Sequence, residues 1–216
     1  MSLTIHGIVA SRAVRPLWAA AELGLPFEHL PTPYKDGATR TPEFLALNPN
    51  GHIPVLVDHR PDGDVVVWES MACTLYVARH HGRGDGTDIA PATAAEDADA
   101  LRWSFWTVTE LEKDALTVLM HRVAMPADQR KPELAEAAEK RLHVPLRVLE
   151  QHLQNQQARG HTHLAADRFT VADLCVASVL NWARAADHML ASYPLTHAWL
   201  HACVNRPVLA KLRAKA

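Results

Sequence analysis

The most specific stretch of the sequence reads NPNGHIPVL and covers residues 48–56. An Asn-Pro-Asn-Gly turn delivers the chain to an Ile53–Pro54 bond just before a short apolar strand. A proline in that place is tolerated where its peptide bond is cis or where the strand lies at an edge. A cis bond would turn the backbone N–H and C=O of Ile53 outward, toward an extended peptide. The alternative is an ordinary turn before an edge strand.

The segments on both sides of this turn alternate between strand and helix periodicity. Before it, the pattern predicts a strand over 3–9, a helix from Val14 to Leu25 and a short strand over 27–30. After it, the pattern predicts a hairpin of strands 54–58 and 65–68, then a helix over 70–81 that ends at Gly82. Residues 31–53 show no regular period. The order β-α-β-irregular-β-β-α predicts an α/β, thioredoxin-like domain over residues 1–82.

A second domain is expected after a flexible connection. Residues 83–91 carry glycines and a proline where few contacts need to cross, which is typical of a linker. Helical periodicity then dominates residues 92–123, 132–156, 170–188 and 196–203. Pro145 is expected to bend the second of these helices. The sequence therefore predicts an all-α C-terminal domain over residues 92–216.

Composition limits the class of protein. An apolar fraction of 48% is enough for a packed core, and no run approaches the roughly 18 to 20 apolar residues of a membrane span. The cysteines are odd in number and far apart, which suits a reducing compartment. The 22 basic and 24 acidic residues are well mixed, so no basic surface for nucleic acid is expected. We expect a soluble, cytoplasmic protein with no membrane or nucleic-acid partner.

Glu69 and Ser70 stand where the second hairpin strand meets a helix. The unpaired N–H groups of a helix N-terminus favour a carboxylate, and the hydroxyl of Ser70 adds a donor. The carboxylate of Glu69 is able to pair with an amino group. Together the two residues suit the head group of an α-amino acid. The alternative is that Ser70 is only a helix cap beside an acidic residue.

Four segments, in this order, resemble the soluble (cytosolic) glutathione S-transferases, and their bacterial members most closely. They read SRAVRPLWAAAELGLPFE (11–28), PEFLALNPNGHIPVLVD (42–58), VVVWESMACTLYVARHHG (65–82) and FTVADLCVAS (169–178). The resemblance spans nearly the whole chain and implies a homodimer of the glutathione S-transferase fold. It implies an enzyme that activates the glutathione thiol as thiolate and adds it to an electrophilic, hydrophobic co-substrate. A non-catalytic glutathione- or ligand-binding protein on the same fold is the alternative.

The resemblance also implies which residues hold glutathione as co-substrate. His52 and Ile53, just before a cis Pro54, correspond to the residues that hold the cysteinyl backbone, Ile53 through its main chain. Glu69 and Ser70 correspond to the pair that binds the γ-glutamyl end, in agreement with the chemistry of those two side chains.

The same resemblance implies a tyrosine, serine or cysteine near the first helix that activates the thiol. The tyrosines lie at positions 34, 76 and 193 and the first cysteine at position 73, so Ser11 remains. Its hydroxyl would donate to the sulfur, helped by the positive end of the first helix and by Arg12 or Arg15. Many serine-type relatives carry an earlier serine where this chain has Ile8. If the thiol meets that earlier position, Ser11 is only an N-cap.

Other parts of the ligands are assigned to side chains outside these motifs. Lys35 or Arg40 would meet the glycyl carboxylate of glutathione. Trp103, Trp106 and Val108 are expected to line an apolar pocket for the electrophile, and packing between domains or subunits is the alternative for the tryptophans.

Two further patterns lie in the C-terminal domain. Thr170 and Asp173 fit a capping box at the head of a buried helix and are expected to be structural. His197 and His201 have the spacing of metal ligands, but neither a neighbouring HExxH glutamate nor an evident third ligand accompanies them. They are interpreted as surface histidines, and no metal or prosthetic group is expected.

Overall fold

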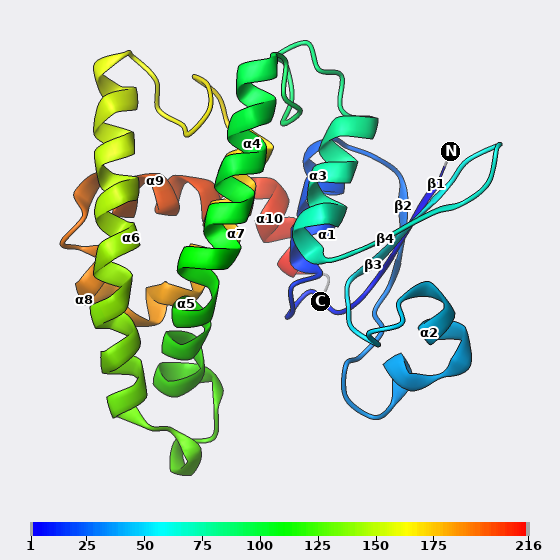
Figure 1. The fold of residues 1–216 in the computed structure, drawn as a ribbon, viewed down its shortest axis with the longest axis horizontal. Coiled ribbons are helices and arrows are strands. Elements are labelled where there is room, and N and C mark those ends of the chain that lie inside the picture. Colours follow the sequence, from blue (N-terminus) through cyan, green and yellow to red (C-terminus); the bar gives the residue numbers. More distant parts are fainter. Residues whose placement is uncertain (1, 215–216) are drawn as a thin grey trace. The chain divides into compact units, whose positions relative to one another are not determined.

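The structure is a computed structural model that describes residues 2–214 (Figure 1). Contacts within the chain divide it into two compact units. The first, here the α/β unit, runs up to Ala92 and includes the segment that begins at Arg206. The second, here the helical unit, runs from Thr93 to Asn205. The predicted domain boundaries at 82, 83 and 91 stay a prediction.

A four-stranded mixed sheet forms the centre of the α/β unit. Its strands are β1 (Ser2–His6), β2 (Phe27–Leu30), β3 (Val55–His59) and β4 (Val65–Trp68), in the spatial order β2-β1-β3-β4. β1 pairs in parallel with β2, whereas the pairs β1–β3 and β3–β4 are antiparallel. The sheet therefore combines a strand–helix–strand crossover with a hairpin, as the sequence predicts.

Helices cover both faces of this sheet. α1 (Val14–Glu22) packs against α3 (Ser70–His81), and α2 (Pro42–Leu47) lies across the sheet from them (Figure 1). On β3, Val55 and Val57 pack with Phe44 of α2. Asp58 points the other way and accepts a hydrogen bond from Tyr76 of α3. The alternation of side chains along β3 thus separates the two layers.

Several predicted boundaries shift where glycine turns the chain. The first strand ends at His6, not at Val9, because Gly7 has φ of +129°. A Cβ at Gly7 would lie 2.6 Å from the Cβ of Ala13, so only glycine fits this turn. α1 ends at Glu22, and Gly24 with φ of +65° follows. The strand 65–68 and the helix 70–81 have the predicted bounds.

The irregular region 31–53 contains helical structure that the sequence analysis did not predict. A 3₁₀ turn covers Ala38–Arg40, and α2 follows it. Thr41 caps α2 by accepting a hydrogen bond from the N–H of Phe44 at 3.2 Å. α2 leads directly into the turn that ends at Pro54.

The helical unit consists of helices and tight helical turns. They are α4 (Ala94–Trp106), a π-helical turn (Thr107–Leu111), α5 (Glu112–Leu119), a second π-helical turn (Met120–Ala124), a 3₁₀ turn (Ala127–Gln129), α6 (Pro132–Ala158), α7 (Val171–Leu180), a 3₁₀ turn (Asn181–Ala186), α8 (Asp187–Leu190) and α9 (Pro194–Val204). Every residue of α7 is buried, which makes it the central helix of this unit. The predicted fold class, an α/β thioredoxin-like domain plus an all-α domain, is confirmed. Within residues 2–214, no helix has the length and apolar content to cross a bilayer.

Asp173 fixes the start of α7. Its buried carboxylate accepts hydrogen bonds from the N–H of Thr170 at 2.9 Å and from the hydroxyl of Thr170 at 2.8 Å. It also accepts from the N–H of Leu164 at 2.9 Å and from Nε1 of Trp199 at 3.0 Å. The predicted capping box is confirmed, and its acid also ties a loop and α9 to α7.

The last helix, α10 (Pro207–Arg213), was not predicted and belongs to the α/β unit. Arg206 just before it donates to both carboxylate oxygens of Glu22 on α1, at 2.7 and 2.8 Å. Trp18 donates to the same carboxylate at 2.9 Å. This buried acid therefore holds α10 against α1.

Candidate functional site

The loop between α2 and β3 is held by Asn48. The Ile53–Pro54 peptide bond is cis, as the family resemblance implies. Asn48 is buried; its Nδ2 donates to the carbonyl of His52 at 2.8 Å, and its Oδ1 accepts from the N–H of Asn50 at 3.0 Å. In the sequence, Asn48 is recognisable only as a turn former. The structure makes it the side chain that fixes the backbone just before the cis bond.

His52 and Ile53 present different groups to the surroundings. The side chain of His52 is exposed, whereas that of Ile53 packs on the cluster of Phe44, Val55 and Val57. Within residues 2–214, no hydrogen bond engages the backbone N–H or C=O of Ile53. An extended peptide chain would find there one donor and one acceptor, the pattern of a strand edge.

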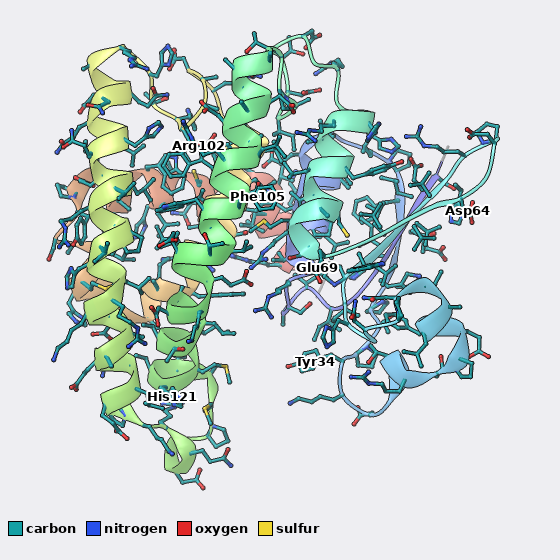
Figure 2. The ribbon with its side chains drawn as sticks, viewed as in Figure 1. Tyr34, Asp64, Glu69, Arg102, Phe105 and His121 are labelled. Carbon is teal, nitrogen blue, oxygen red and sulfur yellow. The ribbon has the colours of Figure 1, made fainter. Side chains whose placement is uncertain are left out.

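Glu69 has a backbone conformation that is rare for a side-chain-bearing residue. Its φ and ψ are +70° and +118°, between the end of β4 and the first residue of α3 (Figure 2). Its carbonyl accepts the N–H of Cys73 at 2.9 Å, and its side chain is exposed. Strained backbone in such a place persists when the surrounding structure holds it, and it is concentrated at ligand-binding sites. Glu69 and the N-terminus of α3 form a polar corner that fits a charged ligand end.

Ser70 is hydrogen-bonded to a buried arginine. Nη1 of Arg15, on α1, donates to Oγ of Ser70 at 2.7 Å. Both side chains are buried, with exposed fractions of 1% for Arg15 and 4% for Ser70. Since Oγ already accepts from a guanidinium, its own O–H remains to be donated to an anion. From the sequence, Arg12 or Arg15 is expected beside the sulfur; in the structure, Arg15 lies beside Ser70.

The hydroxyl of Ser11 is used within its own turn. It donates to the carbonyl of Ile8 at 2.6 Å and accepts from the N–H of Ala13 at 3.1 Å. α1 starts at Val14, and its capping position is Ala13, which offers no side-chain acceptor. Ser11 thus caps the turn that precedes the helix. Its single proton would have to leave the Ile8 carbonyl to reach a ligand.

The two basic residues considered for the glycyl carboxylate differ in position. Nη1 of Arg40 donates to the carbonyl of Asn50 at 3.2 Å, so Arg40 borders the loop that carries His52. Lys35 lies with its Nζ 5.7 Å from the ring centroid of exposed Tyr34 (Figure 2). Of these two residues, Arg40 is therefore the one that is hydrogen-bonded to the loop that carries His52.

The candidate pocket residues of the helical unit are not equivalent. Trp103 is buried, with its ring edge-to-face against Trp106 at 4.9 Å and against His152 at 4.7 Å between centroids. Burial lowers the pKa of His152, and its Nε2 lies 2.8 Å from the Leu164 carbonyl. Trp106 is half-buried and Val108 is 39% exposed. Trp103 therefore has a packing role, whereas Trp106 and Val108 have surface available for a ligand.

An ionic cluster that the sequence did not reveal lies between β3 and α3. Burial raises the pKa of Asp58, but hydrogen bonds from Arg60 at 2.7 Å, Tyr76 at 2.9 Å and His81 at 3.0 Å outweigh it and lower the pKa overall. The carboxylate is completely buried. The cluster pins α3, and with it Ser70, to the sheet.

His197 and His201 lie close together, and the structure brings Asp187 to them. Asp187 is therefore a possible third metal ligand beside the two histidines, which the sequence alone does not indicate.

Models of two protein families match the chain. The one for the glutathione S-transferase N-terminal domain matches residues 1–79, and the one for the C-terminal domain matches residues 113–207. Glutathione S-transferase 3 of Zea mays is 34% identical, over 97% of this chain and 92% of its own length. Glutathione S-transferase GstB of Escherichia coli (strain K12) is 27% identical, over 88% of this chain and 87% of its own length.

Solved structures agree with these relatives. Glutathione S-transferase III in its apo form has a TM-score of 0.80 at 33% identity, covering 99% of this chain and 96% of that one. Glutathione S-transferase I bound with lactoylglutathione has a TM-score of 0.83 at 25% identity, covering 99% of both chains. With matching family models over both halves and a relative at 34% identity over nearly its full length, the chain belongs to the glutathione S-transferase family.

Proposed function

We propose that the α/β unit binds glutathione and that the protein is a glutathione transferase. The backbone of Ile53 pairs with the cysteinyl residue, and His52 flanks it. Glu69 and Ser70 hold the γ-glutamyl end, the carboxylate of Glu69 toward the amino group and the hydroxyl of Ser70 toward the carboxylate. Arg40 meets the glycyl carboxylate.

The observation that carries this proposal is the corner formed by Arg15, Ser70 and Glu69. A buried guanidinium bonded to Ser70 supplies positive charge behind a hydroxyl donor at the N-terminus of the 12-residue helix α3. An exposed carboxylate in a strained conformation stands beside it. Such a corner complements an ammonium and a carboxylate on one carbon, the combination that an α-amino acid carries.

We further propose that Ser11 activates the thiol. Rotation of its O–H from the carbonyl of Ile8 to the ligand sulfur would stabilise thiolate over thiol. Each unit by which the thiol pKa falls requires about 1.4 kcal/mol, which one charge-assisted hydrogen bond and a helix N-terminus supply together. The thiolate then forms a carbon–sulfur bond with an electrophilic carbon, while a leaving group departs with its electron pair or a π-bond pair moves to the neighbouring atom. Trp106 and Val108 stay predicted pocket residues for that co-substrate.

A non-catalytic glutathione-binding protein is the second candidate. The observation that favours it is the 2.6 Å hydrogen bond from Ser11 to the Ile8 carbonyl, which commits the only proton of that hydroxyl. In this case the tripeptide binds at the same corner, but its sulfur stays protonated.

Calorimetric titration with glutathione, together with the ultraviolet absorbance of bound thiolate, tests both candidates. Ser70→Ala is expected to weaken binding, and Ser11→Ala to retain binding but lose the thiolate signal. Ser192→Ala, at an exposed serine of the helical unit, is the matched control and should behave like the parent protein. Absence of glutathione binding refutes the proposal; binding without a thiolate signal in the parent protein selects the non-catalytic candidate.

The assembly and location proposed for the protein are a homodimer and the cytoplasm. Exposed apolar side chains occur on the edge strand β4, where Val66 and Trp68 are each 40% exposed, and on α4, where Phe105 is 66% exposed (Figure 2). Burial of such side chains against a second copy would remove them from water. The reported relatives come from a plant and from Escherichia coli, so the bacterial grouping and the serine type stay predictions.

A further inference from the structure

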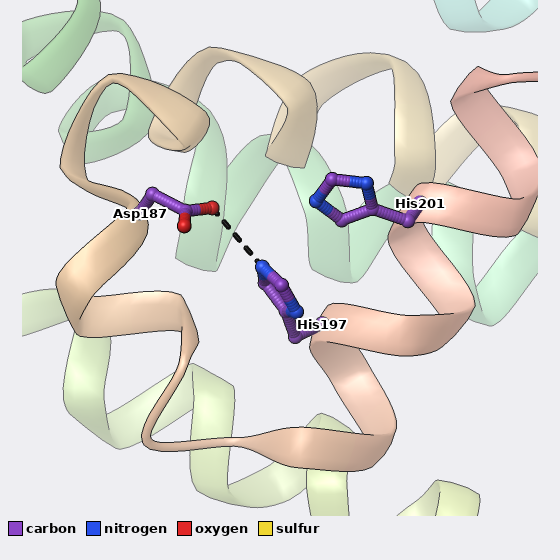
Figure 3. A group of neighbouring side chains, drawn as sticks. All are labelled: Asp187, His197 and His201. Carbon is purple, nitrogen blue, oxygen red and sulfur yellow. Dashed lines mark hydrogen bonds and ion pairs between the residues drawn. The ribbon is translucent and has the colours of Figure 1, made fainter.

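Two histidines of α9 and one aspartate of α8 come together in the helical unit (Figure 3). His197 and His201 are four residues apart on one helix, so their side chains share a face, and their ring centroids are 4.5 Å apart. Asp187 is the first residue of α8, and its Oδ1 lies 3.0 Å from Nε2 of His197. One ring nitrogen of each histidine and one oxygen of Asp187 all lie within 4.8 Å of one another.

His201 distinguishes this cluster from an ordinary surface pair of histidine and aspartate. Its Nε2 is buried and has no hydrogen-bond partner among residues 2–214. Figure 3 shows its ring pointing toward Asp187 and His197. A buried ring nitrogen without a partner is unfavourable, and a cation held between the three side chains would satisfy it.

We propose that Asp187, His197 and His201 form a binding site for a divalent transition-metal ion such as Zn²⁺. Two imidazoles favour Zn²⁺, Cu²⁺, Ni²⁺ or Co²⁺ over Mg²⁺ and Ca²⁺, which prefer ligand sets of oxygen. Three protein ligands suit a tetrahedral ion that takes water as its fourth ligand. The side chain of Asp187 is 61% exposed, so water has access to that position.

The distances require only a small adjustment. Ligand atoms about 2.0–2.1 Å from a tetrahedral ion lie roughly 3.4 Å apart. His197 and Asp187 already meet this spacing at 3.0 Å, where the ion would replace their hydrogen bond. The remaining ligand distances, at most 4.8 Å, close by a side-chain shift of about 1–1.5 Å, within the freedom of these χ angles.

The bound ion would act as a clamp between α8 and α9. Because all three ligands lie in the helical unit, the site does not depend on glutathione binding by the α/β unit. An ion that binds the folded protein but not the unfolded chain raises the free energy of unfolding. At concentrations well above Kd, this gain grows with the logarithm of the ion concentration.

Zinc titration of the full chain, without an affinity tag and after removal of metal by a chelator, tests the proposal. Calorimetry with ZnCl₂ is expected to give one saturable ion per chain in the parent protein. Zinc at about 100 times Kd is expected to raise the Tm by roughly 5–10 °C, and MgCl₂ should leave it unchanged. His201→Gln, which keeps the bond between His197 and Asp187, and Asp187→Asn should each lose the calorimetric site.

His80→Gln is the matched control, since His80 is an exposed helical histidine outside the cluster and should bind zinc like the parent protein. Circular dichroism checks that every variant folds, and the visible absorption of added Co²⁺ reports four-coordinate binding without relying on stability. Absence of a saturable site in the parent protein refutes the proposal. A site that His201→Gln retains, or that His80→Gln loses, refutes it as well, because the ion then binds elsewhere.

Discussion

Arg15 is expected to govern glutathione affinity although it lies inside a helix and has an exposed fraction of only 1%. Its Nη1 holds Ser70 through a 2.7 Å hydrogen bond and places a positive charge behind the hydroxyl that would meet the γ-glutamyl carboxylate. Arg15→Met keeps the length of the side chain and removes both contributions. Hydrogen bonds to charged groups contribute about 1.5–3 kcal/mol, so the Kd for glutathione should rise roughly 10- to 150-fold.

Stability should respond differently from affinity. Arg15→Met leaves the buried Oγ of Ser70 without its donor, which costs about 1–3 kcal/mol, so the Tm should fall by roughly 2–10 °C even without glutathione, whereas the loss of affinity appears only with the ligand. Because the lost interaction holds ground state and transition state alike, KM for glutathione should rise while kcat changes little. Calorimetry, thermal unfolding and steady-state kinetics measure these three quantities.

A double-mutant cycle with Ser70→Ala separates this role from general packing. In the Ser70→Ala background, Arg15→Met should weaken binding much less than in the parent protein, since the two side chains act through one contact. Arg159→Met, at an exposed arginine near the end of α6, is the matched control and should leave affinity unchanged. An unchanged Kd for Arg15→Met, or fully additive losses in the cycle, would refute the reasoning.

Three further predictions concern stability and assembly. Asp173→Ala removes an acceptor of four hydrogen bonds, including that of Trp199, and should lower the free energy of unfolding by about 3–5 kcal/mol in denaturant titrations. Asp58 has a lowered pKa in the folded state, so its contribution is complete above pH about 4 and is lost as pH falls through the folded-state pKa. Unfolding at pH 7 should therefore show Asp58→Asn to be less stable than the parent protein, with a gap that closes in acid; a gap that persists there would contradict the assignment. Phe105→Ser should raise the dimer dissociation constant by about tenfold or more in sedimentation experiments, and equal constants would exclude α4 from the interface.

The sequence predicted those elements whose signals are local. The strand 65–68 and the helix 70–81 were correct to the residue because the turn-forming residues 60–64 precede the strand and Gly82 ends the helix. α2, with six residues, is too short to show a helical period and was missed. The succession of Thr41, Pro42 and Glu43 is a helix-start signal that would have indicated it. α10 was missed because its place depends on a long-range contact between Arg206 and Glu22.

Some residues of the candidate site are also evident from local sequence signals, whereas others depend on long-range contacts. Ile53, Glu69 and Ser70 stand in motifs whose spacing is local, and the position of proline before a strand left the cis bond as one of two possibilities, of which the structure has the cis one. Arg15 contradicts the usual exposure of arginine, and only the fold brings it to Ser70, 55 residues away. Asp187 was missed for the same reason, because the turn between α8 and α9 decides whether it meets His197.

For Ser11, elimination of other residue types in the sequence identifies the position of the hydroxyl but not its chemistry. Listing the residue types near the first helix leaves one hydroxyl, and its position between strand and helix is confirmed by the structure. Its chemistry depends on a proton that rotates about a single bond between the Ile8 carbonyl, 2.6 Å away, and a sulfur that is present only with the ligand. Within the described residues 2–214, only Ser11 donates to the carbonyl of Ile8. Transfer of its proton to sulfur therefore costs a hydrogen bond, which the negative charge of the thiolate must offset. Hydrogen bonds to an ion are roughly twice as strong as neutral ones, so the exchange favours the thiolate. The same exchange with a neutral thiol gains nothing, so the role proposed for Ser11 predicts that it discriminates between the two protonation states of the ligand.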